Sequence, residues 1–418
     1  MKKKTIILTF IALLCFSWEG WTQDSITTLD DCLRQARENN LTLHAGRIAI
    51  EKAKDLQGTA FAIGKTSLAL SQDPTSGGSP DNSLSLSQSF EFPTVYATRH
   101  SLLKAETEVE RNRLNVSENE VIKDVTSLYY SLLLEKERIR ILQQQSTVYN
   151  RFLFLASAKV QAGEANRLEQ IHAERLCNEN ALVLKNATRE YLNVQLRMQN
   201  QLNTHALIEP AEDSLIIRPI SPLFNENWDA SQAPQCKIFE SQRMAGEKNL
   251  SLQRQGFIPE IHLALRNQLV LKGFNPYDIP RERFDKGNFM GFEAGISVPL
   301  FFGEQRAKAK AAKREVEIIQ TQKETALMLI QQAYETALNE YQQAKAALEY
   351  YLQTGNRLAE EITQISQLSY EKGEIGYLEY IQNLQTAVDI RLQYAHAVND
   401  YNQAVIILES FKLLSCKL

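Results

Sequence analysis

Long stretches of the chain repeat hydrophobic residues in heptads. In the second half the spacings are 4, 3, 4, 3, 4 and 3, and no proline interrupts residues 303–370. The residues in that series are Ile330, Tyr334, Ala337, Tyr341, Ala344, Leu348 and Tyr351. A comparable series in the first half, interrupted once by Glu135, contains Val121, Val125, Leu128, Leu132, Ile139 and Leu142. This pattern predicts supercoiled helices with knobs-into-holes packing. A helix of about 60 residues would be about 90 Å long.

Two other regions alternate hydrophobic and polar residues instead. In residues 66–92, leucine and phenylalanine alternate with serine on both sides of a loop rich in Gly, Pro and Asp at 73–82. Residues 259–300 repeat the arrangement, with a loop that carries Pro276, Pro280 and Gly287. Alternation with a period of two, flanked by turn residues, predicts a β-hairpin in each region.

Strands of this length and alternation match the sequence signature of a membrane β-barrel. Four strands cannot close a barrel, because about eight are the minimum. An open sheet cannot lie in lipid either, because its edge groups would lack hydrogen bonds. If these strands lie in a membrane, several chains must share one barrel, and three chains would supply about twelve strands. The alternative is a soluble pair of hairpins that caps a helical bundle.

The chain also contains an internal duplication. Pro93 corresponds to Pro299, 206 positions later, at the expected change from strand to helix. Around the helical turns the offset is 210, and it relates Gly163, Glu164, Leu168 and Glu169 to Gly373, Glu374, Leu378 and Glu379. The difference of four between these offsets predicts an insertion of about one helical turn. Each glycine follows a heptad series, where a residue with positive φ lets the chain reverse into the next helix.

The duplication defines the expected domain organisation. A first repeat at 24–206 contains a helix, a hairpin at about 66–92 and a long helical hairpin with its tip near residue 163. A proline-rich linker at 207–235 follows, and a second repeat at 236–418 has its hairpin at about 259–300 and its tip near residue 373.

The first 23 residues are typical of an export signal. Lys2, Lys3 and Lys4 precede an apolar run at 6–16, and small residues stand before Gln23. Lipidation at Cys15 is the alternative to simple cleavage. After residue 23 no apolar stretch approaches the roughly 18 residues that a membrane-spanning helix needs.

Composition and motifs argue against several classes of function. Lys and Arg number 46 and Asp and Glu number 50, so the net charge of −4 does not favour nucleic acid as a partner. The five cysteines show no CxxC spacing, and the six histidines are dispersed. We find no GxSxG, Walker or HExxH motif. The sequence therefore predicts no enzyme, no catalytic residue, no cofactor and no metal site.

The order of these segments resembles that of the TolC-type outer membrane efflux proteins. An export signal is followed by residues 27–53, a hairpin that ends in FEFP, a coiled-coil pair with a Gly-Glu turn, and then the whole repeated. The short length and the segment SFEFPTVY look most similar to the CusC/CzcC-like heavy-metal efflux branch. The resemblance implies a mainly α fold with a β-barrel part: four transmembrane strands per chain, and a homotrimer with a twelve-stranded barrel and a twelve-helix periplasmic tunnel.

The resemblance also implies a location and partners. The protein would lie in the cell outer membrane, contact its lipid and extend into the periplasm. It would be the exit duct of a tripartite efflux system, working with a periplasmic adaptor protein and an inner-membrane RND-type pump. Substrate, with heavy-metal cations as the first expectation, would pass through passively. Drug efflux and type I protein secretion are alternatives within this class, and an exported coiled-coil rod without a pore is the alternative outside it.

Carried over by position, the resemblance assigns roles to the turns. Both Gly-Glu turns, Gly163-Glu164 and Gly373-Glu374, would form the periplasmic tip. Glu379 would line the aperture, where a ring of carboxylates favours cations; the other aperture candidates are Gln382 and Glu169. Ile375 stands where a basic latch residue occurs in the type member. The alternative is that Glu169 and Glu379 are solvated helix-surface charges.

Leu168, Tyr377 and Leu378 are the candidate adaptor contacts. Helix-to-helix docking would use apolar residues of this kind. The alternative is that all three belong to the ordinary core of the helical hairpins.

Overall fold

The computed structural model describes residues 25–74, 80–163, 166–220, 228–268 and 290–412. The expected export signal, Cys15 and the loop at 269–289 lie outside these ranges. The described chain is mainly helical and forms two compact units. Unit 1 comprises residues up to 44, 117–229 and 331 onward; unit 2 comprises 45–116 and 230–330. Each unit takes segments from both sequence repeats, so the compact units divide the chain differently from the predicted repeats.

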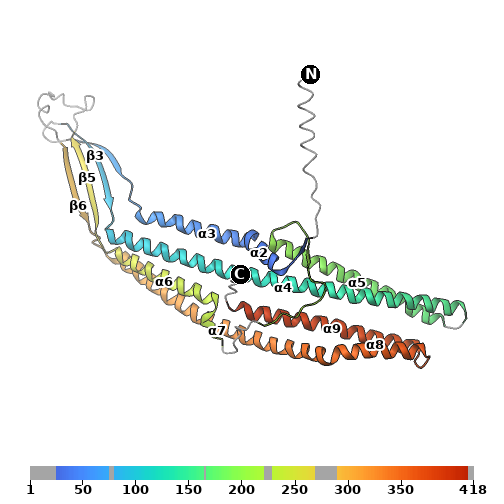
Figure 1. Ribbon diagram of the computed structural model, residues 1–418. Helices are drawn as coiled ribbons and strands as arrows, with labels where there is room; N and C mark the ends of the chain where they lie inside the picture. The colour runs from blue at the N-terminus through green and yellow to red at the C-terminus, as the bar shows by residue number, and fades with distance from the viewer. Residues whose placement is uncertain (1–24, 75–79, 164–165, 221–227, 269–289, 413–418) are drawn as a thin grey trace, which may run out of the picture. The chain divides into compact units, whose positions relative to one another are not determined.

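Unit 2 contains a four-stranded antiparallel sheet (Figure 1). Its strands are β2 (Ser67–Pro74), β3 (Pro80–Phe90), β5 (Glu260–Gln268) and β6 (Met290–Ser297). The order is β2-β3-β5-β6, so β3 and β5 join the hairpins of the two repeats and leave β2 and β6 at the edges.

The register places the hydrophobic residues of all four strands on one face. Leu68 pairs with Leu86, Leu86 with Leu265, and Leu265 with Phe292. Each of these four side chains is at least 44% exposed. The opposite face carries small and polar residues, as in the row formed by Ser67, Ser87, Ala264 and Glu293. The serine alternation in the sequence therefore corresponds to one polar face of the sheet.

Helices continue from the strands within unit 2. They are α3 (Leu41–Gln57), the first part of α4 (Pro93–Gln161), α6 (Pro234–Gln255) and the first part of α7 (Gly303–Tyr350). Pro93 is the first residue of α4, where the missing N–H costs no helical hydrogen bond. A Cβ on Gly246 of α6 would lie 3.3 Å from side-chain carbons of Val316 and Ile319, so this glycine lets α6 and α7 approach closely.

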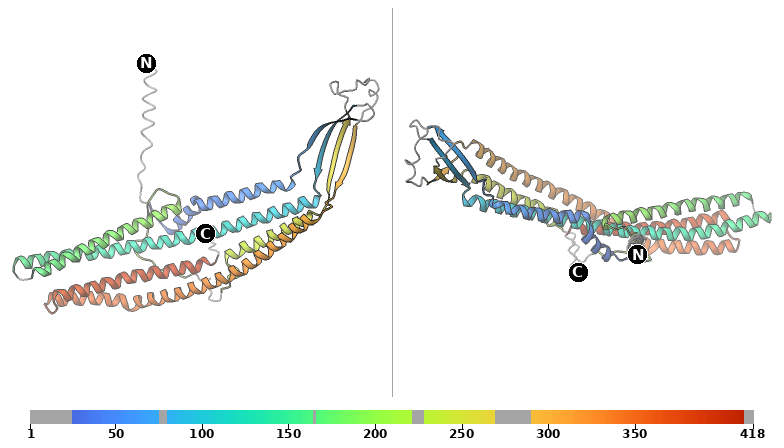
Figure 2. Two further views of the ribbon diagram at one scale, coloured as in Figure 1. Left: turned by 180° about the vertical axis from the view of Figure 1, so that it is seen from behind. Right: turned by 90° about the horizontal axis from the view of Figure 1, so that it is seen from above.

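Unit 1 is built from two long helical hairpins. The later part of α4 runs against α5 (Arg167–Leu202), and the later part of α7 with α8 (Asn356–Glu371) runs against α9 (Tyr377–Ser410), as Figure 2 shows. Helix α2 (Leu29–Asn39) and the parallel pair β1 (Ser25–Thr27) and β4 (Ile208–Pro210) complete the unit.

The predicted heptad positions face inward in these helices. Val125 and Leu132 are fully buried, and Tyr334 is almost fully buried. Glu135, which interrupts the first series, is 7% exposed and lies 3.5 Å from Arg138. Burial raises the pKa of the Glu135 carboxyl.

The structure corrects the predicted insertion. Residues 93–161 form α4, and residues 303–371 form α7, a π-helical turn and α8, so both ends of the two helical arms are offset by 210. The four additional residues are therefore not a helical turn. They form the non-helical connector Pro299–Phe302 between β6 and α7. Pro299 lies within this connector, whereas its counterpart Pro93 begins a helix.

The second arm is not one continuous α-helix, contrary to the expectation from its heptads. Tyr351–Gly355 forms a π-helical turn, in which the N–H of Asn356 donates to the carbonyl of Tyr351. A Cβ on Gly355 would lie 2.6 Å from a ring carbon of Tyr351, so the glycine makes room for this ring. The spacing of proline and glycine in the sequence did not indicate that this turn contains one residue more than an α-helical turn.

Asn402 attaches the linker to α9. Its side chain is fully buried, its Oδ1 accepts from the Arg218 N–H, and its Nδ2 donates to the Ile216 carbonyl, both at 2.8 Å. Arg218 also forms a salt bridge of 2.8 Å with Glu409. These contacts satisfy backbone groups in a segment without regular structure.

We expect Asn402→Ala to lower the free energy of unfolding by about 2 kcal/mol, because it leaves a buried N–H and a buried carbonyl without partners. The measurement is urea unfolding of the purified protein in detergent, followed by circular dichroism. Asn200→Ala removes an exposed amide of α5 and is the control. Equal midpoints for both variants would contradict this role for Asn402.

Candidate functional site

The two turns of the helical hairpins form the candidate site. One lies between the end of α4 at Gln161 and the start of α5 at Arg167, and the other between Glu371 and Tyr377. Both turns lie at the same end of unit 1 (Figure 1). The two glycines of the duplicated turns, Gly163 and Gly373, therefore lie at the same end of the unit.

Each turn depends on a glycine with left-handed backbone. Gly163 and Gly373 both have φ of +77°, in agreement with the reversal that the sequence predicts. At the second turn the Gly373 N–H donates to the Tyr370 carbonyl, and the Glu374 N–H donates to the Ser369 carbonyl at 2.8 Å. This pair of bonds is a Schellman motif, which satisfies the last carbonyls of α8. Glu164 lies outside the described residues.

The two helices that leave the turns begin differently. Asn166 caps α5, since its Oδ1 accepts from the Leu168 N–H at 3.1 Å. Gly376, at the equivalent position before α9, offers no side chain. Glu169 and Glu379 stand in the first turns of α5 and α9. A carboxylate there interacts favourably with the positive end of the helix dipole, which gives both residues a local stabilising role.

Aromatic rings connect the two hairpins at this end. Tyr377 of α9 stacks on Phe152 of α4, with ring centres 3.9 Å apart and planes at 6°. Tyr370 stacks on Tyr380 across the second hairpin at 4.6 Å. Lys159 of α4 places its Nζ 5.9 Å from the centre of the Tyr370 ring. Stacked pairs of this kind stabilise beyond the area that they bury.

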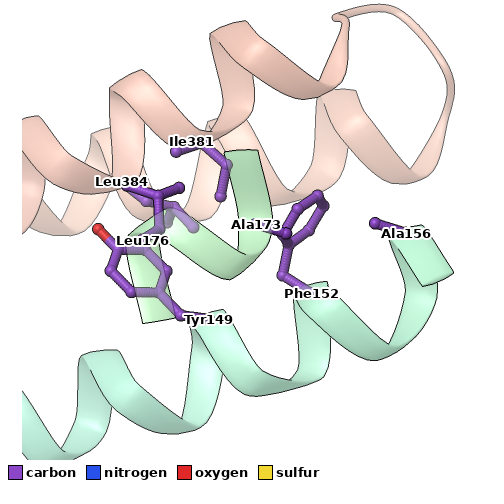
Figure 3. Packing of buried hydrophobic residues seen from close by; sticks show 7 residues of the cluster. All are labelled: Tyr149, Phe152, Ala156, Ala173, Leu176, Ile381 and Leu384. Atoms are coloured by element: carbon purple, nitrogen blue, oxygen red, sulfur yellow. The ribbon is translucent and has the colours of Figure 1, made fainter. Parts of the chain in front are cut away.

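A small hydrophobic core lies behind these rings (Figure 3). It draws on three helices, α4, α5 and α9, whose buried side chains point toward one another. Its members are Tyr149, Phe152, Ala156, Ala173, Leu176, Ile381 and Leu384. The packing therefore joins the first hairpin to the second, although the contributing segments are more than 200 positions apart in the sequence.

Tyr377 contributes its ring to this core at the cost of a buried hydroxyl. Its phenol oxygen is buried and has no hydrogen-bond partner among the described residues. Burial, followed by the nearby charge of Glu169, raises the pKa of the Tyr377 phenol. The hydroxyl therefore stays protonated, and the ring supplies the useful contact.

The other predicted residues point toward solvent. Leu168 and Leu378 are 56% and 59% exposed, which leaves both free for a contact outside the chain. Glu379 and Gln382 are exposed, and Glu169 is partly buried. The structure thus separates the three candidate adaptor contacts: Tyr377 packs inside the chain, whereas the two leucines do not.

Sequence reasoning missed several residues of this region. They are Phe152, Lys159, Asn166, Tyr370 and Tyr380. Tyr370 and Tyr380 lie on either side of the duplicated turn around Gly373, so their stacking could have been inferred from the sequence. Phe152 carried no such signal, because its partner Tyr377 is distant in sequence.

The described residues offer no evident place for a resident metal ion. Within them, no group of three or more His, Cys, Asp or Glu side chains is arranged to hold one. Cys32 and Cys236 are both buried.

No helix in the described ranges has the length and apolar character needed to cross a membrane.

Comparison with protein-family models gives a match over the second repeat. Residues 231–411 match the family described as outer membrane efflux protein. The second repeat is therefore similar to outer membrane efflux proteins. The resemblance inferred from the order of the sequence segments is thereby confirmed. Comparison with curated proteins finds no match.

Solved structures of outer membrane channels have the same fold over nearly the whole chain. A structure of CusC is 16% identical, covers 95% of this chain and 95% of its own, and superposes with a TM-score of 0.75. The MtrE outer membrane channel of Neisseria gonorrhoeae, in its open state, is 16% identical and covers 91% and 88%, with a TM-score of 0.73. The CmeC outer membrane channel of Campylobacter jejuni is 16% identical and covers 96% and 92%, with a TM-score of 0.69.

We expect Gly373→Ala to destabilise the protein by about 1 kcal/mol, because an L side chain is strained at φ of +77°. Gly376→Ala is the matched control, three residues away, with φ of −74° and open space around its Cα. Hydrogen exchange of the amides at 369–380 measures the effect. Faster exchange in both variants, or in neither, would argue against a conformational requirement at Gly373.

We expect Tyr377→Ala to lower the free energy of unfolding by about 2 kcal/mol, because it removes the stacked ring. Tyr377→Phe keeps the ring, discards only an unpartnered hydroxyl, and should be neutral or slightly stabilising. Urea unfolding of the three proteins makes the comparison. A loss of stability in Tyr377→Phe would show that the hydroxyl has a partner in the assembled protein.

Proposed function

We propose that this protein is the outer membrane exit duct of a tripartite RND-type efflux system. The observation that supports this most directly is the sheet of unit 2. It has one exposed hydrophobic face, one small and polar face, and two edges, β2 and β6, that each pair on one side only among the described residues.

Such a sheet needs both a membrane and further copies of itself. The hydrophobic face favours lipid, yet each unpaired N–H or carbonyl at an edge would cost several kcal/mol in hydrocarbon. Pairing β6 of one copy with β2 of the next removes both edges. Three copies give a barrel of about twelve strands, within the known range for outer membrane barrels. The small residues of the polar face would line a wide, water-filled exit.

In this proposal the helical hairpins of three copies form a periplasmic tunnel of about twelve helices, counting four from each chain. The predicted domains take their roles accordingly: an export signal at 1–23 delivers the chain, and the two repeats, 24–206 and 236–418, each supply one hairpin of strands and one of helices. The turns at Gly163 and Gly373 form the periplasmic tip.

The exposed leucines Leu168 and Leu378 are the proposed contacts for a periplasmic adaptor protein. They lie in the first turns of α5 and α9, where an apolar helix face of a partner can dock. Tyr377 is left out of this surface, because its ring is already packed on Phe152.

Glu379 is the proposed aperture residue, with Gln382 one turn further along α9. Both side chains are exposed, so three copies could place three carboxylates around a constriction and favour cations. Opening would separate the tip contacts, and the packing of Phe152 on Tyr377 ties the two hairpins of one chain together during that movement.

Heavy-metal cations are the proposed substrate, on the resemblance to the CusC/CzcC-like branch. A passive duct needs no metal-binding cluster, so selectivity would come from the pump. Drug efflux and type I protein secretion remain the alternatives for the same architecture. The remaining alternative, a coiled-coil rod without a pore, provides no role for an exposed hydrophobic sheet face.

We expect a deletion strain to become sensitive to one or more of copper, silver, zinc, cobalt and cadmium, and complementation to restore growth. Graded plates with these metals, dyes and detergents make the measurement. Sensitivity to dyes and detergents instead would identify a drug duct. Recovery of the protein only from the soluble fraction, without heat-modifiable migration, would support the rod.

We expect Glu379→Ala to change the cation preference of the channel, because it removes one carboxylate from each chain at the proposed aperture. The measurement is the reversal potential in planar bilayers under a salt gradient. Glu360→Ala removes an exposed carboxylate of α8 away from the turn and serves as the control. If both variants keep the original reversal potential, Glu379 does not line the aperture.

A further inference from the structure

The connector between β6 and α7 exposes large hydrophobic residues. Leu300 and Phe301 are 81% and 89% exposed. The connector Pro299–Phe302 has no counterpart in the first repeat, where α4 begins directly at Pro93. Duplication of the barrel and helix segments therefore does not account for it.

The connector follows directly on a strand that bears the hydrophobic face of the sheet. Phe292 and Ile296 lie on that face of β6, and Val298 and Leu300 come just after the end of the strand at Ser297. All four side chains are more than half exposed. The connector thus marks the end of the hydrophobic face nearest to α7.

A stripe of cations follows directly on α7. Arg306, Lys310 and Lys313 are spaced i, i+4 and i+7, which places them within an arc of about 60° on one side of the helix. All three are exposed, and no described carboxylate lies within 4.0 Å of them. Neighbouring cations differ, since Lys308 pairs with Glu304 and Arg314 with Glu317.

This cationic stripe does not face the neighbouring helix. Val316 and Ile319, which approach Gly246 of α6, lie roughly 110° away around α7. At the corresponding positions of α4, 210 residues earlier, stand Tyr96, His100 and Leu103. The stripe is therefore a feature of the second repeat.

We propose that Leu300 and Phe301 together with Arg306, Lys310 and Lys313 form a binding surface for anionic phospholipids. The hydrophobic pair enters the boundary between acyl chains and headgroups, and the cations contact headgroup phosphates. The stripe extends over about 10 Å along α7, comparable with the depth of a headgroup layer plus the reach of a lysine side chain. This inference rests on the proposed placement of the sheet in the outer membrane.

Charge complementarity favours lipid over other occupants. Basic residues beside a bilayer are attracted to anionic headgroups, and the attraction fades within a Debye length. Interfacial segments commonly combine aromatic and basic residues in this way. A second copy of the chain would have to offer carboxylates opposite all three cations, and this is the competing outcome of the test.

The test measures thermal unfolding of the purified protein in neutral detergent, with added phosphatidylglycerol or phosphatidylcholine. We expect phosphatidylglycerol to raise the unfolding midpoint of the unmodified protein by at least about 2 °C at low salt, and by much less in 0.5 M NaCl. The combined variant Arg306→Gln, Lys310→Gln, Lys313→Gln should lose this shift. The control variant Lys54→Gln, Lys237→Gln, Lys248→Gln removes equal charge from exposed positions of α3 and α6 and should keep it.

Three results would overturn the proposal: an undiminished shift in the combined variant, an equal shift with phosphatidylcholine, or a smaller oligomer for the variant alone. The last result would assign the stripe to a contact between copies. Phe301→Ser provides a second test, with a reduced shift expected although every cation remains. Failure of the duct proposal would appear separately, as unmodified protein absent from the outer membrane fraction.

Discussion

The hydrogen-bonding demand of the strand edges is the constraint on which the remaining architecture depends. One chain supplies four strands with matched hydrophobic rows, such as that from Leu68 to Phe292, but leaves β2 and β6 unpaired on one side within the described chain. Water could satisfy those edges, whereas the hydrophobic face requires lipid. In the proposed assembly, closure by further copies would meet both demands at once. The helices that continue from the strands would then be gathered into one ring, so that barrel and tunnel would form together.

The turns of the helical hairpins combine a tight reversal of the chain with packing contacts between the two repeats. Gly163 and Gly373 allow the reversal because only glycine takes φ of +77° without strain. The Phe152 and Tyr377 rings then connect helices from different repeats. A small hydrophobic core behind the rings, drawn from α4, α5 and α9, reinforces that connection.

The two repeats differ from each other at two places. Their helical arms keep the same length, yet the second arm contains the π-helical turn Tyr351–Gly355, and only the second repeat has the connector Pro299–Phe302. The equal length of the helical arms is common to both repeats, whereas the π-helical turn and the connector are found in the second repeat. The connector and the adjoining cations of α7 occur in the second repeat and are the basis of the proposed lipid contact.

The sequence by itself determined the long helices, both β-hairpins and the glycine turns, because each is encoded by local periodicity or by a backbone conformation that few residues adopt. The order of these segments then carried the resemblance to a known family. Sequence reasoning took the four-residue insertion for a helical turn, and it missed the π-helical turn because the heptad series ends at Tyr351, where that turn begins. It also could not separate Tyr377 from Leu168 and Leu378, since all three are apolar at similar helical positions. Only the tertiary structure made that distinction, because Phe152 lies 225 positions away from Tyr377 in the sequence and meets it through the packing of two hairpins.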